Sequence, residues 1–172
     1  GGWIGTGSTA MKHHWPEPGV VGVQGTGGTT VQRGVDKGMT VYLDSVDARA
    51  DGFASGGVSE GALWIIHDTV DEVVTVSDTQ VAGAILLLME RAKQVVEGAG
   101  AASVAALLSD DLDVSGERVM PLLCGGNLDM TQLQTVLVHA LTQRKQRIQL
   151  RVHIDDRPGQ MSKISGLIAD QG

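Results

Sequence analysis

Short apolar segments alternate with segments of helical periodicity along most of this chain. Residues 19–24, 72–76 and 119–123 are largely apolar or β-branched, which is typical of parallel strands buried on both faces. The segments around them predict a glycine loop that opens a helix within 1–12, and helices over 29–37, 60–70, 79–93, 98–108 and 130–143. Strands that alternate with helices in this way predict a doubly wound α/β fold with a mostly parallel sheet.

The pattern changes near the C-terminus. Apolar and polar residues alternate over 148–154 and predict a strand with one solvent-facing side, and a turn at 155–159 leads into a predicted helix over 160–168. We therefore divide the chain into two domains, residues 1–145 and residues 146–172, of which the second begins but does not finish. The chain starts in a glycine loop and stops at a helix end, so we expect it to be a fragment of a longer protein.

Composition narrows the range of functions. The 172 residues carry a net charge of -7, which argues against a nucleic-acid partner because phosphate neutralisation needs a basic surface. No apolar run approaches the roughly 20 residues that a membrane span needs, so no membrane association is expected. The single cysteine, Cys124, excludes an internal disulfide framework and fits a reducing compartment. We expect a cytoplasmic globular protein.

Cys124 is the first candidate for chemistry. It stands at the C-terminal end of the predicted strand that begins at Val119, and it precedes Gly125 and Gly126, a turn that lets another group approach closely. Ligands collect beyond the carboxyl ends of strands in open α/β sheets, so a thiol placed there is a candidate cofactor contact. The alternative is an inert buried cysteine, which is the commoner role of this residue.

Two further features are candidates for ligand binding. Gly1 and Gly2 precede a predicted helix, where backbone N–H groups and the helix dipole form a cradle for phosphate. Two glycines before a helix are also common without any ligand. Glu97 is a lone carboxylate among small apolar residues between two helices, and its alternative role is that of a helix N-terminal acid favoured by the dipole.

The order of the motifs along the chain is specific. The chain carries, in sequence, a glycine loop, A-D-G, V-D-E-V-V-T-V-S-D, E-R-A-K-Q-V-V-E-G-A-G-A-A and L-L-C-G-G-N. This series resembles the pyridoxal-phosphate-dependent threonine ammonia-lyases, or threonine dehydratases, which share a fold type with serine racemase and serine dehydratase. The likeness runs from Gly1 to about Lys145. The C-terminal L-R-V-H-I-D-D-R-P-G-Q-M-S-K-I-S-G-L-I-A looks like the start of a ferredoxin-like ACT regulatory domain.

The resemblance implies a partial tryptophan-synthase-beta-like fold that binds pyridoxal 5'-phosphate. Gly1, Gly2 and Trp3 would match the end of a four-glycine loop whose amides hold the cofactor phosphate. Cys124 would face the pyridine nitrogen, a position that Ser or Cys takes in this family. A neutral thiol cannot hold that nitrogen protonated as a carboxylate would, and the weaker electron sink suits expulsion of a β-hydroxyl. Two further residues would lie near the ring: Glu97 and Asn127.

The chain departs from the family pattern in two ways. The lysine that forms the Schiff base lies in a Ser-Phe-Lys segment upstream of the glycine loop, and no such segment occurs here. We therefore assign no catalytic residue, and we expect the chain's own lysines, Lys12 among them, on solvated faces. The divalent-metal site of serine racemase-like members uses a carboxylate just after the second strand and another six residues on. These positions are Gln24 and Thr30, so no metal is expected.

The resemblance also implies an activity. The parent enzyme would convert L-threonine, and also L-serine, to 2-oxobutanoate or pyruvate and ammonia by β-elimination. The fragment would be inactive alone because it lacks the lysine. Two alternatives stay open: an amino-acid-binding regulatory portion, and a serine racemase or serine dehydratase. The expected partners are an amino-acid substrate, an amino-acid effector at the ACT segment and a second copy of the chain in a homo-oligomer.

Overall fold

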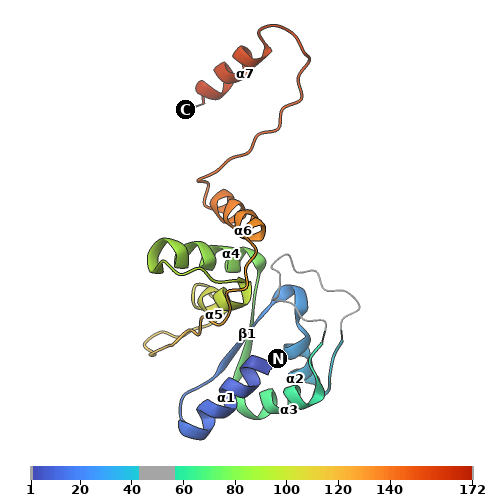
Figure 1. Cartoon of the computed structure of the whole chain (residues 1–172), viewed down its shortest axis with the longest axis vertical. Coiled ribbons are helices and arrows are strands. Elements are labelled where there is room, and N and C mark those ends of the chain that lie inside the picture. The colour runs from blue at the N-terminus through green and yellow to red at the C-terminus, as the bar shows by residue number, and fades with distance from the viewer. Residues whose placement is uncertain (1, 43–56, 172) are drawn as a thin grey trace.

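The computed structural model describes residues 2–42 and 57–171 (Figure 1). Gly1 and the A-D-G motif at 50–52 lie outside these residues. The elements, in chain order, are α1 (Gly2–His14), β1 (Val21–Gly25), the 3-10 helix η1 (Thr26–Gly28), α2 (Thr30–Lys37), α3 (Glu60–Thr69), β2 (Glu72–Val76), α4 (Asp78–Leu87), the π-helix η2 (Leu88–Ala92), α5 (Gly98–Leu107), α6 (Met130–Gln143) and α7 (Gln160–Ala169).

The two strands form a parallel pair with helices on both faces. β1 and β2 are in register over five residue pairs. Successive residues of a strand point to opposite faces of a sheet. Val23 and Val74 belong to the core that contains the α5 alanines, whereas the backbone of Gly22 lies against Ile4 of α1. This arrangement confirms the predicted α/β class with a parallel sheet.

The larger core lies between the sheet and the helices α4, α5 and α6. Val76, Val81 and Ile85 are at most 1% exposed and pack with Ala101 and Ala105 of α5, which are fully buried. Burying a side chain the size of isoleucine stabilises the fold by about 1.5–3 kcal/mol. This cluster therefore fixes α5 against β2 and the rest of the core.

The second core lies among α1, α2 and α3. Leu63 and Ile66 of α3 are buried and pack with Ile4 of α1. A Cβ atom on Gly5 would lie 3.3 Å from Cγ2 of Ile65, so a glycine here lets α1 approach α3 closely. The hydroxyl groups of Ser8 and Thr69 join the same two helices at 2.6 Å.

The longest predicted helix has a different end from the one expected. α4 begins with a capping box, in which the backbone N–H of Gln80 donates to the hydroxyl of Ser77 at 3.3 Å and the N–H of Ser77 donates to the Gln80 side chain at 2.7 Å. Its last turn is the π-helix η2, and Lys93 ends it in the left-handed conformation with φ 58°. The expected single α-helix to residue 93 is therefore wrong beyond Leu87.

Two strands predicted from the sequence do not form within the described part of the chain. Residues 119–123 are extended but unpaired, and Met120 and Leu122 are 78% and 52% exposed, so the prediction of a buried strand was wrong here. Residues 148–154 are likewise outside any sheet. A strand needs a neighbour to pair its N–H and C=O groups, and β1 and β2 pair only with each other among the described residues.

The C-terminal part stands away from the rest. Figure 1 shows α6 above α4 and an extended segment that leads from it to α7. α7 contains no buried residue. Nowhere in 2–42 or 57–171 is a helix long and apolar enough to cross a bilayer.

Candidate functional site

The segment that carries Cys124 runs along the N-terminal half of α5. The hydroxyl of Ser103 donates to the carbonyl oxygen of Leu122 at 3.0 Å, and the backbone N–H of Glu97 donates to the carbonyl oxygen of Gly125 at 3.3 Å. These two hydrogen bonds hold the segment on either side of Cys124. The cysteine is free and half-buried.

Gly125 has to be a glycine for two reasons. Its φ of 139° lies in a region that side-chain-bearing residues rarely adopt. A Cβ atom on Gly125 would also overlap Oε1 of Glu97, and one on Gly100 would lie 2.7 Å from the carbonyl oxygen of Gly125. The backbone next to Cys124 is therefore in direct contact with the Glu97 carboxylate and with the first turn of α5.

Glu97 occupies the N-cap position of α5, but its side chain makes no capping hydrogen bond. A carboxylate at this end of a helix is favoured by the dipole, which agrees with the simpler role considered for it from the sequence. Its contact with Gly125 adds a second role, because it links this helix end to the residue after Cys124. The geometry brings two of the predicted site residues, Glu97 and Cys124, to one place.

The other predicted residues are less closely connected to that place. Asn127 is exposed two residues beyond Gly125. Gly2 is the first residue of α1, and Trp3 is 65% exposed with its ring over Gly7 of the same helix. Gly1 lies outside the described residues. The phosphate cradle at the start of α1 therefore stays a prediction.

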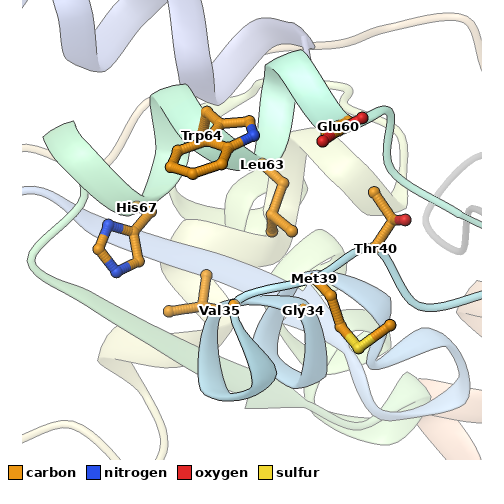
Figure 2. Close-up of a pocket in the computed structure, with 9 residues that line it drawn as sticks. Gly34, Val35, Met39, Thr40, Glu60, Leu63, Trp64 and His67 are labelled. Atoms are coloured by element: carbon orange, nitrogen blue, oxygen red, sulfur yellow. The ribbon is translucent and has the colours of Figure 1, made fainter.

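A separate hollow, which the sequence did not predict, lies between α2 and α3 (Figure 2). Its volume is about 270 Å³, and none of its lining residues belongs to α5 or to the Cys124 segment. Figure 2 shows Trp64 and His67 of α3 on one side and Met39 on the other. The exposed indole of Trp64 on the polar face of a predicted helix was the signal that could have indicated it.

Lys12 and Asp71 form an ion pair that ties α1 to the start of β2. Lys12 Nζ lies 2.8 Å from Asp71 Oδ2, and the N–H of Val20 donates to the same oxygen at 2.7 Å. The hydrogen bond from Lys12, followed by that from Val20, lowers the pKa of the Asp71 carboxyl from its ordinary value. The Lys12 side chain is 24% exposed, so it reaches solvent but is also held by an ion pair that the sequence did not predict.

The two positions that correspond to metal carboxylates are buried and hold no acid. Gln24 and Thr30 are 8% and 1% exposed. The Gln24 amide donates to the carbonyl oxygen of Gly28 and accepts from the N–H of Gln32 at 3.0 Å. No group of three or more His, Cys, Asp or Glu side chains gathers as a metal site among the described residues. The side-chain oxygen of Gln24 is taken by the Gln32 N–H, its NH2 group faces the Gly28 carbonyl, and neither position carries a carboxylate. This arrangement does not fit a divalent cation, which needs free oxygen ligands and prefers carboxylates.

Comparison with known proteins identifies the family to which this chain belongs. Residues 1–125 match the family described as pyridoxal-phosphate dependent enzyme, and the chain is a member of that family.

Three known proteins show what the chain is similar to within this family. The chain is 33% identical to an L-threonine ammonia-lyase of Thermotoga maritima, over 100% of this chain and 43% of that protein. Among solved structures it is similar to the processed form of threonine deaminase isoform 2 from Solanum lycopersicum, with 26% identity and a TM-score of 0.74 over 81% of this chain and 39% of the other. A maize serine racemase gives 26% identity and a TM-score of 0.72 over 84% and 45%. The chain spans less than half the length of these relatives.

Pyridoxal phosphate is the cofactor of this family, and the surroundings of Cys124 fit one edge of it. The thiol is neither sealed in the core nor fully exposed, and the backbone of the glycine beside it lies against the Glu97 carboxylate. A thiol and a carboxylate are the polar groups that Cys124 and Glu97 offer there. Polar atoms of this kind can meet the edge of a planar aromatic ring.

Proposed function

We propose that this chain forms the Cys124 side of the cofactor site in an enzyme that deaminates L-threonine. The reaction removes the α-proton and the β-hydroxyl of threonine and yields 2-oxobutanoate and ammonia; L-serine would give pyruvate in the same way. The names of the relatives support the substrate. The observation that carries the proposal is the contact between the Glu97 carboxylate and the backbone of Gly125, the residue that follows Cys124.

The residues of the chain would divide the work as follows. Bound pyridoxal phosphate supplies the electron sink for bond cleavage at the α-carbon of the amino acid. Cys124 would hold the pyridine nitrogen with a neutral thiol, which leaves the nitrogen unprotonated. Glu97 would act as a positioning residue, because its carboxylate lies against Gly125 and its N–H binds the Gly125 carbonyl. The Schiff-base lysine would come from residues that precede this chain in the parent enzyme.

The domain division, the partners and the compartment complete the proposal. Residues 1–145 would be the C-terminal part of the catalytic domain, with Gly1, Gly2 and Trp3 at the end of the phosphate loop. Residues 146–172 would begin an ACT domain that binds an amino-acid effector, and the exposed apolar residues of this segment support it because they have no partner within the described residues. We also propose that the protein forms a homo-oligomer and that it lies in the cytoplasm. The free cysteine supports this compartment, because thiols stay reduced there.

The test uses the complete protein that carries this sequence, loaded with pyridoxal phosphate. We expect 2-oxobutanoate from L-threonine. Replacement Cys124→Ala should lower kcat by at least about tenfold because a hydrogen bond to the ring is lost. The matched variant Cys124→Ser should keep most of the activity, since a hydroxyl offers the same neutral contact. A folded, cofactor-loaded protein that makes no 2-oxobutanoate would refute the proposal.

Serine racemase is the rival activity, and the similarity to the maize enzyme motivates it. The same protein incubated with L-serine separates the two. Release of pyruvate and ammonia without D-serine supports the lyase, whereas accumulation of D-serine as the main product supports the racemase.

A further inference from the structure

The buried side chain of Gln24 holds the loop between β1 and α2 together by hydrogen bonds. Gln24 lies near the carboxyl end of β1, and its side chain is buried. One end of its amide donates to the carbonyl oxygen of Gly28 in η1, and the other accepts from the backbone N–H of Gln32 in α2. A single side chain therefore joins three consecutive elements: β1, η1 and α2.

The partners leave only one orientation for this amide. The carbonyl of Gly28 is an acceptor, so the NH2 group of Gln24 must face it. The N–H of Gln32 is a donor, so the carbonyl oxygen of Gln24 must face that. Glutamine is the side chain of this length that carries a donor and an acceptor at its end. A carboxylate would set an oxygen against the oxygen of Gly28.

The contact with Gln32 also replaces a missing helix cap. Thr29 is the N-cap residue of α2, and its side chain makes no capping hydrogen bond. Gln32 is the third residue of the helix, and its N–H is one of the donors that a helix N-terminus leaves without an intrahelical partner. Gln24 satisfies that donor from the preceding strand.

We propose that the Gln24 amide occupies the place of a divalent cation in this loop and makes the chain independent of such a cation. The resemblance described from the sequence implies a carboxylate at this position in serine racemase-like members. Here an N–H group points at the Gly28 carbonyl, where a cation would need an oxygen ligand. The amide supplies by hydrogen bonding the cross-link that a metal would supply by coordination. The inference rests on the loop geometry and does not depend on the proposed function.

The key variant is Gln24→Glu in the complete protein, with melting temperature as the readout. One carboxylate oxygen can still accept from Gln32, but the other meets the Gly28 oxygen at a buried position. In EDTA we expect the melting temperature to fall by about 5 °C, since a buried acceptor is left facing another acceptor. Millimolar Mg²⁺, Ca²⁺ or Mn²⁺ should restore most of the loss, because a cation between the two oxygens satisfies both.

Three comparisons control the experiment. The unaltered protein should melt at the same temperature in EDTA and in each cation at matched ionic strength. Gln134→Glu makes the same change at an exposed position of α6 and should show neither the loss nor the rescue. Gln24→Met removes both hydrogen bonds without adding charge, and it should be destabilised equally with and without cation.

Each result decides for or against the inference. An unaltered protein that is stabilised by a divalent cation would overturn it. So would a Gln24→Glu protein that is as stable as the unaltered one in EDTA, or one that no cation rescues. If Gln24→Glu does not fold, the Gln24→Met variant decides. If this variant melts at the same temperature as the unaltered protein, the hydrogen bonds of the Gln24 amide do not stabilise the loop and the inference is overturned.

Discussion

The body of the chain, residues 2–42 and 57–145, and its tail, residues 146–171, contain apolar residues in similarly regular patterns, yet only the body buries them. In the body, Ile66 and Ile85 are at most 1% exposed. In the tail, Ile148 and Ile168 are 76% and 53% exposed, and α7 has no buried residue. A periodic pattern shows which face of an element is ready for burial, but another element has to supply the opposing surface.

The largest expected effect separates body from tail by one matched substitution. Ile85→Ala in α4 should lower the free energy of unfolding by about 2–4 kcal/mol, because it leaves a cavity in the main core. Ile168→Ala in α7 should change it by no more than about 0.5 kcal/mol. Urea denaturation of the 172-residue chain measures both, because in the complete protein the rest of the proposed ACT domain would cover the tail. Equal losses would mean that the tail packs as tightly as the body within this chain.

A second prediction tests the most constrained point of the body. Gly125→Ala should lower the free energy of unfolding by about 2–3 kcal/mol, because φ at this position is 139° and the added Cβ would overlap Glu97. Gly126→Ala is the control, since a Cβ there meets nothing within 4 Å. We also expect only the first variant to lose affinity for pyridoxal phosphate in a titration. Equal behaviour of the two glycines would remove the structural basis for placing the cofactor beside Cys124.

The smallest effect concerns the ion pair at the edge of the body. Asp71→Asn should cost no more than about 1 kcal/mol at neutral pH, because the pair is partly exposed. The folded-state pKa of Asp71 is lowered, so its contribution is present above the unfolded-state value and is lost as the pH falls through the folded-state value.

The melting temperatures of the unaltered and Asp71→Asn proteins should therefore converge as the pH falls through the acidic range below about 4. Asp156→Asn in the tail is the control for the removal of one negative charge. A gap that widens toward acid would contradict the assignment of the shift to the bonds from Lys12 and Val20.

The sequence predicted the elements whose limits depend on nearby residues. β2 has the predicted bounds because a β-branched run ends at the capping residue Ser77. α6 also has its predicted bounds, and the side chain of Asp129 accepts from the N–H of Thr131 at its start. Such signals act within a few residues, so a single sequence contains them.

The features that the sequence could not predict depend on contacts with backbone that lies far away along the chain. The pattern of residues 119–123 was correct for a strand, but no strand of the described part pairs with it. Cys124 and Glu97 were both candidates, but their proximity follows from how Gly125 lies against Gly100. At Gln24 the sequence showed only that an acid was missing, and the two backbone partners of the amide came from the folded loop.

The alanine-rich surface of α5 has a consequence for how the Cys124 segment is aligned. Ala101, Ala102, Ala105 and Ala106 are all buried, so this helix presents nearly the same smooth contour at successive turns. Side-chain packing by itself would give little resistance if α5 shifted along its own axis by one turn relative to the Cys124 segment. The hydrogen bonds from Ser103 to Leu122 and from Glu97 to Gly125 oppose such sliding. They therefore fix the position of the Cys124 sulfur atom along the helix axis.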